Sequence, residues 1–285
     1  MRTGFRVRLA GLSPRRRMFV AGVSAVVTVA VLLAGLQAGG VFSTPVAKTV
    51  PSAPDTVLLV PGYGGAKGAL DVLAARIRRT GMIARVVTLP GQGTGDLTAQ
   101  ATVLNDDVNH VLHAGAGQVD VIGYSAGGVV TRVWDATDGG AQKARRIITL
   151  GSPLNGTRIA AAGTAADPSA CPVACQELVP GSALLTKLRR TPLGQKPGWL
   201  SLWSVDDQVV RPPGSARLAG AVNVPLQSVC PGLLIGHGQL PVSPLVIGIV
   251  LQALGPGPLT APTRAECGTL QRLGRGSGGG RAQGG

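Results

Sequence analysis

From residue 55 onward the chain alternates short runs of aliphatic, often β-branched residues with longer stretches whose apolar residues recur at helical spacing. This alternation predicts the α/β class of fold, a mostly parallel central sheet with helices on both faces. We expect strands over residues 56–60, 84–89, 119–123, 145–151, 199–205 and 222–229. We expect helices over 68–81, 96–115 and 126–137, and a last helix over 244–255. In such sheets, active residues collect in loops at the carboxyl ends of the strands.

The two ends of the chain differ from this central part. Residues 1–38 contain arginines followed by an uncharged apolar run, "MFVAGVSAVVTVAVLLAGL", and are interpreted as a signal peptide or an N-terminal membrane anchor. A Pro/Ser/Gly linker over 39–54 precedes the predicted folded domain, 55–268, and a disordered Gly/Arg tail follows over 269–285. We therefore expect an exported protein, either secreted or held outside the cytoplasm by membrane attachment of its N-terminal segment.

The net charge of +14 is concentrated at the two ends of the chain. Residues 1–47 hold six arginines and no acidic residue, and residues 272–285 hold three arginines and no acidic residue. Basic and acidic residues are much closer to balance over 48–271. A nucleic-acid-binding domain carries its basic residues as a patch or stripe on the folded part. The charge distribution therefore argues against a nucleic-acid partner.

Four cysteines agree with an oxidising compartment. Four cysteines allow three pairings, of which we favour Cys171 with Cys175, in a tight local loop, and Cys230 with Cys267, which would pin the C-terminal segment. The alternative is a zinc site. No second close pair and no histidine lies near 171–175, so the pattern favours disulfides and no bound metal.

The stretch "GYSAG", residues 123–127, matches the pattern G-x-S-x-G. Such a short pattern arises by chance at a rate of roughly 0.3 per chain of this composition, so its position relative to the predicted elements is stronger evidence than the match itself. It follows a predicted strand and opens a predicted helix, which is where a nucleophile elbow lies. We therefore predict that Ser125 is a nucleophile, against the alternative of a serine in an ordinary turn.

A serine hydroxyl is a weak nucleophile and needs a base. The chain has three histidines, and two of them, His110 and His113, precede the predicted nucleophile. In folds with this elbow the order along the chain is serine, then acid, then histidine. His237, between glycines after the last predicted strand, is the remaining candidate base.

The acid that orients the base is expected between Ser125 and His237, directly after a strand. Asp206 and Asp207 follow the predicted strand 199–205, and the residues alone do not separate them. Other aspartates in the interval occupy a helix end or a long loop; they are Asp135, Asp138 and Asp167.

A developing oxyanion needs two backbone N–H groups. The residue after the nucleophile, Ala126, would supply one of them. The loop after the first strand, "PGYGG", would supply the other through Tyr63, since Gly62 and Gly64 let the backbone approach a substrate. A phosphate-binding loop is the weaker alternative, because no Gly-Lys-Ser/Thr follows.

The segments "VLLVPGYGG", "LPGQGTGD", "VIGYSAGG", "LGSPLNGT", "WSVDDQVVRP" and "GHGQLP" occur in this order over residues 55–245. In these segments the chain resembles the small secreted lipases and esterases of actinobacteria, relatives of the minimal lidless bacillus-type lipase A in the α/β-hydrolase superfamily. The resemblance implies hydrolysis of carboxylic esters without a cofactor. In that family the acid lies in a segment like YSxxDxxV, and the match to "WSVDDQVVRP" selects Asp207.

Two features depart from that family. Pro61 stands where many members carry a histidine before the glycine of the first loop. The connection 154–198, which holds Cys171 and Cys175, is long for a minimal fold, and we expect it to form a flap or a wall of the acyl pocket.

The sequence thus predicts a monomeric ester hydrolase for lipid or small acyl-ester substrates, with Ser125, Asp207 and His237 as a catalytic triad. Three alternatives use the same fold. An envelope acyltransferase would pass the acyl group to an alcohol instead of water, a peptidase would cleave amides with the same triad, and a binding module would have kept the fold without catalysis.

Overall fold

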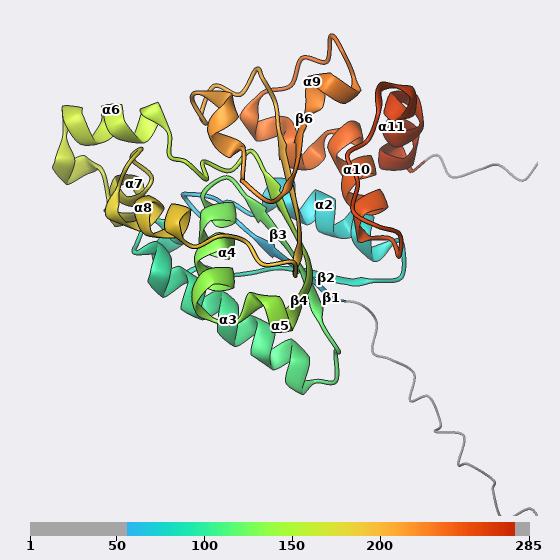
Figure 1. Cartoon of the computed structure of the whole chain (residues 1–285), viewed down its shortest axis with the longest axis horizontal. Helices are drawn as coiled ribbons and strands as arrows, with labels where there is room; N and C mark the ends of the chain where they lie inside the picture. Colours follow the sequence, from blue (N-terminus) through green and yellow to red (C-terminus); the bar gives the residue numbers. More distant parts are fainter. Residues whose placement is uncertain (1–55, 277–285) are drawn as a thin grey trace, which may run out of the picture. The chain divides into compact units, whose positions relative to one another are not determined.

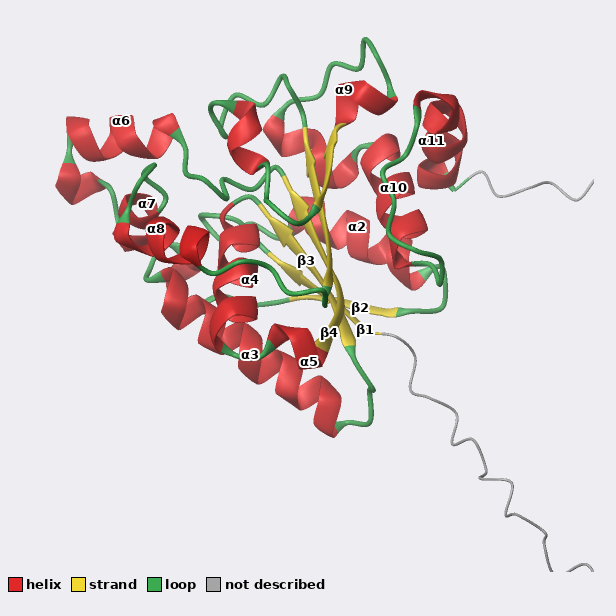
Figure 2. Cartoon of the chain, in the orientation of Figure 1, coloured by secondary structure: helices red, strands yellow, loops and turns green. Residues whose placement is uncertain are grey.

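The computed structural model describes residues 56–276, which form a six-stranded sheet in the order β2-β1-β3-β4-β5-β6 with every neighbouring pair parallel (Figure 1; Figure 2). The strands are β1 (Thr56–Val60), β2 (Ile83–Val86), β3 (Val119–Tyr124), β4 (Ala144–Leu150), β5 (Gly198–Trp203) and β6 (Val222–Pro225). The predicted parallel α/β sheet is confirmed. The central strand β3 lies between β1 and β4, with Val60 paired to Gly123 and Gly123 paired to Thr149.

Helices cover both faces of the sheet, as Figure 2 shows. The helices are α2 (Gly68–Arg78), α3 (Leu97–His113), α4 (Ala126–Thr137), α5 (Gly140–Lys143), α6 (Arg158–Ala166), α7 (Val173–Glu177), α8 (Ala183–Arg190), α9 (Leu226–Val229), α10 (Pro244–Leu254) and α11 (Cys267–Arg275).

Strand side chains alternate between two buried cores. Along β1, Val57 and Leu59 join a core with residues of α2, α10 and α11, while Leu58 and Val60 join a second core with residues of α3, α4 and α8. All five residues of β1 are buried, as expected for a strand covered on both faces. The chain has few aromatic residues, and both cores consist mainly of aliphatic side chains.

The predicted elements from 56 to 205 are present with small shifts at their ends. The predicted strand over 222–229 is wrong in its second half, because Pro225 ends β6 and the chain turns into the short helix α9. Proline has no N–H to donate to a sheet, so the pairing cannot continue beyond it.

The helix over 244–255 is present as α10 but is not the last one. Residues 269–275, which we assigned to a disordered tail, belong to α11, so the folded domain extends beyond residue 268. Helix α11 packs closely on α10: a Cβ on Gly274 would lie 1.7 Å from the carbonyl oxygen of Pro244, and one on Gly248 would lie 2.0 Å from that of Leu270.

Both predicted disulfides are present. Cys171 is bonded to Cys175 between the 3₁₀ turn Pro168–Ala170 and α7, and Cys230 is bonded to Cys267 at the start of α11. The predicted N-terminal signal peptide or anchor lies outside the described residues. Within residues 56–276, no helix is both long and apolar enough to cross a bilayer.

Candidate active site

Ser125 lies at a sharp turn between β3 and α4. Its backbone has φ 53° and ψ −127°, a conformation that side chains rarely adopt, and its N–H donates to Leu150 O at 2.9 Å. Such strain persists only where the surrounding structure enforces it, and it is concentrated at functional sites. The turn has the features predicted for a nucleophile elbow.

Three glycines make this turn possible. A Cβ on Gly123 would lie 2.5 Å from Gly128 Cα, and one on Gly127 would lie 2.3 Å from Val60 O. The pattern singled out Gly123 and Gly127 but not Gly128, where a Cβ would lie 2.0 Å from Ser152 Oγ. A contact of this kind depends on which residue of the β4–α6 connection reaches α4, so the local sequence does not reveal it.

His237 lies beside Ser125 at the start of a 3₁₀ helix, His237–Val242. Its Nε2 is 2.9 Å from Ser125 Oγ, and its Nδ1 is 2.7 Å from Asp207 Oδ2. With the ring proton on Nδ1, this nitrogen donates to the carboxylate and Nε2 is free to accept the serine proton. The other two histidines, His110 and His113, are exposed in the last turn of α3.

The carboxylate of Asp207 is fully buried and accepts hydrogen bonds with both oxygens. Oδ2 faces His237, and Oδ1 accepts from the N–H groups of Val209 and Val210, each at 2.8 Å. Hydrogen bonds of this kind offset the cost of burying a charge. Asp206 points elsewhere: it is exposed, and its Oδ2 accepts from Gln227 Nε2 at 3.1 Å.

The remaining candidate acids are engaged away from the histidine. Asp135 pairs with Arg132 at 3.5 Å, Asp138 accepts from Thr137 Oγ1 at 2.6 Å, and Asp167 accepts from Ser169 N at 2.9 Å. Of the five aspartates considered, Asp207 alone meets His237 among the described residues.

Two residues that the sequence reasoning missed support the histidine. The ring of Tyr124 stacks on that of His237 with centroids 5.2 Å apart, and its hydroxyl donates to His237 O at 3.2 Å. Burial raises the pKa of Tyr124 to about 12, and the carboxylate of Asp207 acts in the same direction. Gly151 lies next to both partners of the ion pair, where a Cβ would be 3.1 Å from Asp207 Oδ2 and 3.3 Å from His237 Nδ1 and would also meet the side chain of Leu240.

The loop after β1 approaches the serine closely. A Cβ on Gly62 would lie 2.8 Å from Ser125 Cβ and 3.4 Å from Ser125 Oγ, so only glycine permits this approach. Tyr63 follows directly, and Ala126 is the first residue of α4, whose N–H has no partner within the helix. Both residues line the cleft next to Ser125. Their N–H groups are therefore well situated for the predicted oxyanion role, which remains a prediction.

A cleft of about 270 Å³ opens beside Ser125. The α6–α7 segment forms much of its lining, as expected for a wall contributed by the long 154–198 connection. The lining residues are Tyr63, Ser125, Ala126, Pro153, Thr157, Ile159, Ala160, Gly163, Cys175, Leu178, Val209 and Val210. Over residues 56–276, the structure contains no group of three or more His, Cys, Asp or Glu side chains arranged to hold a metal ion.

No family model and no curated protein matches the sequence. The fold is similar to that of Aspergillus fumigatus lipase B, at 17% identity and a TM-score of 0.60; the alignment covers 78% of this chain and 61% of that one. The chain thus spans less than two thirds of that lipase.

Two other solved structures match most of their own length. The mature lipase BlEst2 of Bacillus licheniformis is 18% identical, with a TM-score of 0.52, over 63% of this chain and 85% of that chain. A structure from the metagenome-derived lipolytic enzymes LipS and LipT is also 18% identical, with a TM-score of 0.54, over 70% and 93%. The chain has the α/β-hydrolase fold. In this fold, Ser125 lies at the carboxyl end of the central strand β3, and the loops that carry Asp207 and His237 follow strands of the same sheet.

Proposed function

We propose that this protein, which has the α/β-hydrolase fold, is a serine hydrolase of carboxylic esters, acting on lipid or other acyl-ester substrates. The observation that carries the proposal is the continuous series of hydrogen bonds from Ser125 through His237 to the buried Asp207, at the side of an apolar cleft. The similar solved structures are named as lipases or lipolytic enzymes, which favours esters over amides.

In the proposed acylation step, Ser125 Oγ attacks the ester carbonyl while His237 Nε2 takes the hydroxyl proton. Asp207 holds the ring in the productive tautomer and stabilises the imidazolium that forms. The N–H groups of Tyr63 and Ala126 stabilise the negative oxygen of the tetrahedral intermediate. As the intermediate collapses, the C–O bond to the alcohol breaks, and His237 returns the proton to the leaving oxygen.

Deacylation repeats these steps with water as the nucleophile. His237 removes a proton from water, whose oxygen attacks the acyl-enzyme carbonyl. The bond to Ser125 Oγ then breaks, the serine regains its proton from His237, and the carboxylic acid leaves. Apart from the ester and water, the groups named in this cycle are side chains and backbone groups of the chain.

We also propose that the protein is exported and acts as a monomer, either secreted or attached by its N-terminal segment. All four cysteines are in disulfides, which is compatible with an oxidising compartment. Fractionation of the producing cell, with detection of the protein in medium, membranes and cytoplasm, tests the location. Accumulation of the oxidised protein in the cytoplasm would contradict it.

The function is tested by following p-nitrophenyl butyrate hydrolysis with oxidised protein and with Ser125→Ala. We expect kcat to fall by about 10⁶-fold in the variant, the loss typical of a missing serine nucleophile. A fluorophosphonate probe should label the wild type and not the variant. Labelling without turnover of any ester would indicate acyl transfer to an alcohol or amide hydrolysis, and absence of labelling would indicate a non-catalytic binding module.

A further inference from the structure

The cleft beside Ser125 offers hydrocarbon surface and almost no polar group. Apart from Ser125 and Tyr63, the one hydroxyl of its lining is that of Thr157, and no charged side chain lines it. The Thr157 hydroxyl is already engaged: it donates to Val209 O at 2.7 Å and accepts from Arg211 N at 3.0 Å. A polar substituent in the cleft would therefore lose its hydration without gaining a partner.

The cleft has a buried floor and an exposed apolar rim. Ala160, Leu178 and Val210 are almost fully buried. By contrast, Tyr63 is 45% exposed and Ile159 is 53% exposed. Single exposed apolar side chains are common, but apolar side chains that together line one groove are typical of a site for an apolar ligand, and Tyr63 and Ile159 line the same cleft. Because Ser125 lines the same cleft, that group is best matched by the acyl chain of the ester.

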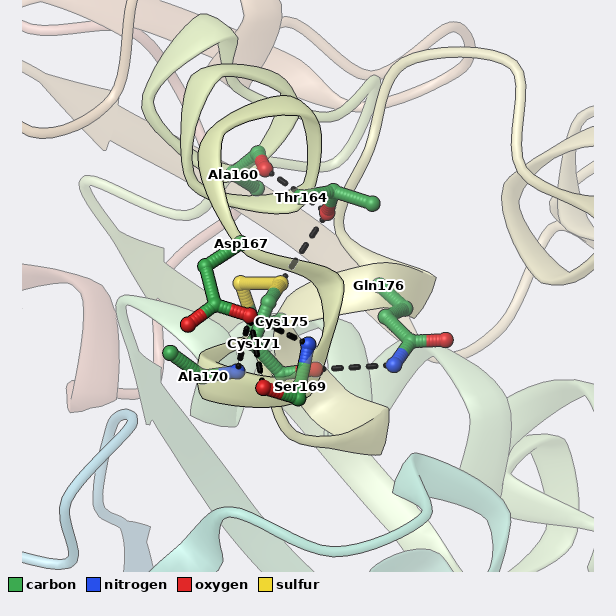
Figure 3. Close-up of a disulfide and its surroundings, with 8 residues drawn as sticks. All are labelled: Ala160, Thr164, Asp167, Ser169, Ala170, Cys171, Cys175 and Gln176. Carbon is green, nitrogen blue, oxygen red and sulfur yellow. Dashed lines mark hydrogen bonds between the residues drawn. A yellow bond between two sulfur atoms is a disulfide. The ribbon is translucent and has the colours of Figure 1, made fainter.

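The wall opposite Ser125, formed by α6 and α7, is fastened at several points. Thr157, at the start of α6, is bonded to the loop that follows Asp207. At the other end of α6, Thr164 Oγ1 lies 3.0 Å from Cys171 Sγ and donates to Ala160 O at 2.9 Å, as Figure 3 shows. The disulfide then joins Cys171 to Cys175 on α7.

Helix α7 is fastened in turn to the start of α3. Glu177 Oε2 accepts from Leu97 N at 2.8 Å, and Ala174 N donates to Thr94 O at 3.1 Å. The wall is therefore bonded to the rest of the fold at two places, at the start of α6 through Thr157 and at α7 through Ala174 and Glu177. The cleft is therefore formed in the free protein and does not require a helix to move before a chain enters.

Small groups line the part of the cleft formed by α6. Thr157, which caps α6, is followed at a spacing of about one turn by Ala160 and Gly163, so the exposed Gly163 is the lining residue of α6 farthest along the helix from the Asp207 loop. A Cβ on Gly163 would lie 3.8 Å from Cys175 Sγ, in ordinary contact. A larger side chain at this position would occupy the end of the cleft.

We propose that this preformed cleft binds a single acyl chain of medium length and that Gly163, opposite Cys175, sets the length accepted. The proposal rests on the proposed ester hydrolysis. A methylene group is similar in size to a water molecule, whose share of liquid volume is about 30 Å³. The cleft of about 270 Å³ therefore has room for several methylene groups of one acyl chain.

The experiment measures kcat/KM of the full oxidised chain for p-nitrophenyl esters from acetate to palmitate. Each methylene buried in the cleft should raise kcat/KM by about three- to fourfold, until the cleft is full at a medium chain length, and kcat/KM should not rise further from there to palmitate. Gly163→Leu fills the far end and should lower the octanoate-to-butyrate ratio of kcat/KM by about tenfold or more, since it removes space for two or more methylenes.

Ala162→Leu is the matched control, because Ala162 is exposed on the same helix and does not line the cleft. It should keep the wild-type ratio. Leucine is a better helix former than glycine, so Gly163→Leu is expected to fold, and circular dichroism checks this.

The possible failures are distinguishable. If the wild type cleaves short esters but prefers acetate, or if Gly163→Leu keeps the wild-type ratio, the proposed acyl site is wrong while the ester hydrolase remains. If the wild type cleaves no ester and the probe does not label Ser125, the proposed function itself is wrong.

Discussion

The side of the cleft that carries the turn 123–128, here called the elbow side, differs from the wall formed by α6 and α7 in the space around its glycines. On the elbow side, a Cβ added to Gly123, Gly127 or Gly128 would lie 2.5 Å or less from its nearest neighbour. On the wall, the nearest neighbour of a Cβ on Gly163 is 3.8 Å away. The elbow side therefore tolerates almost no change in shape, whereas the wall has space for larger side chains.

The two sides also differ in how their polar groups are used. On the elbow side, the hydrogen bonds of Asp207 and His237 converge on Ser125. On the wall, the hydrogen bonds of Thr157, Thr164 and Glu177 fasten one helix to the next and leave the cleft apolar. If the proposed ester hydrolysis is right, we expect the elbow side to set the rate and the wall to set which acyl chain is accepted, so that the two properties can be changed separately.

The largest expected effect separates two adjacent residues of the elbow side. Asp207→Asn should lower kcat by about 10⁴-fold, because an amide favours the wrong histidine tautomer and does not stabilise the imidazolium. Asp206→Asn is the matched control and should change kcat by less than about twofold, because Asp206 is exposed and bonded to Gln227. Equal losses in both variants, measured with p-nitrophenyl butyrate, would contradict the assignment of the acid.

The two disulfides test whether a bond can contribute much to stability while leaving the acyl-chain selectivity unchanged. Replacing both Cys230 and Cys267 by serine should lower the free energy of unfolding by roughly 4 kcal/mol, because that bond closes a long loop. Replacing both Cys171 and Cys175 by serine should cost only roughly 2 kcal/mol, because the loop is short. Urea unfolding under non-oxidising and non-reducing conditions measures both losses.

The same variants should affect selectivity in the opposite order. Loss of the bond between Cys171 and Cys175 loosens the wall and should lower the octanoate-to-butyrate ratio, while loss of the remote bond should leave it unchanged. A changed ratio in the variant without Cys230 and Cys267 would show that the wall is not the separate element inferred above.

Replacing one glycine on each side by alanine tests the difference in the free space around the two glycines. Gly127→Ala should lower the free energy of unfolding by about 3 kcal/mol or more, because the new methyl group meets the carbonyl oxygens of Val60 and Pro61. Gly163→Ala should raise it by up to about 1 kcal/mol, because alanine is the better helix former. Similar changes in the free energy of unfolding for the two variants, measured by urea unfolding, would contradict the inferred difference in free space between the elbow side and the wall.

The smallest expected effect concerns Tyr124, which supports the histidine from the elbow side. Its pKa is raised to about 12 by burial, so the folded state favours the neutral phenol. That contribution to stability is fully present below the pKa of about 10 of an unfolded tyrosine, and it is lost as the pH rises towards the folded value. Tyr124→Phe should therefore have a smaller fall in urea midpoint than the wild type between about pH 9 and pH 11.5. Identical pH profiles would contradict the stated environment of the phenol.

Much of the elbow side was predictable from the sequence, because the positions of its residues depend on the order of elements along the chain. The strand, the G-x-S-x-G turn and the helix located Ser125, and the order of residues after it left His237 as the base. Asp206 and Asp207 could not be separated by pattern alone, because adjacent residues in a turn point in different directions. The structure brings only Asp207 to the histidine.

Other features depend on contacts between distant segments, which a single sequence does not show. Gly151 and Gly128 have no local signal that distinguishes them from the many other glycines. Helix α11 was missed because its sequence, "CGTLQRLGR", contains two glycines that are unfavourable in a helix. One of those glycines, Gly274, allows the close contact with α10, as Gly248 does from the side of α10, and local preference cannot reveal such a contact.

The wall enters the fold between β4 and β5, which are neighbours in the sheet. An insertion between neighbouring strands can be lengthened, shortened or exchanged without altering strand order, and the entropy of closing such a loop grows only slowly with its length. For a laboratory that wishes to redesign the proposed activity, or for natural selection acting on duplicated genes, this connection is the segment in which to vary the lining of the cleft while Ser125, His237 and Asp207 stay in place.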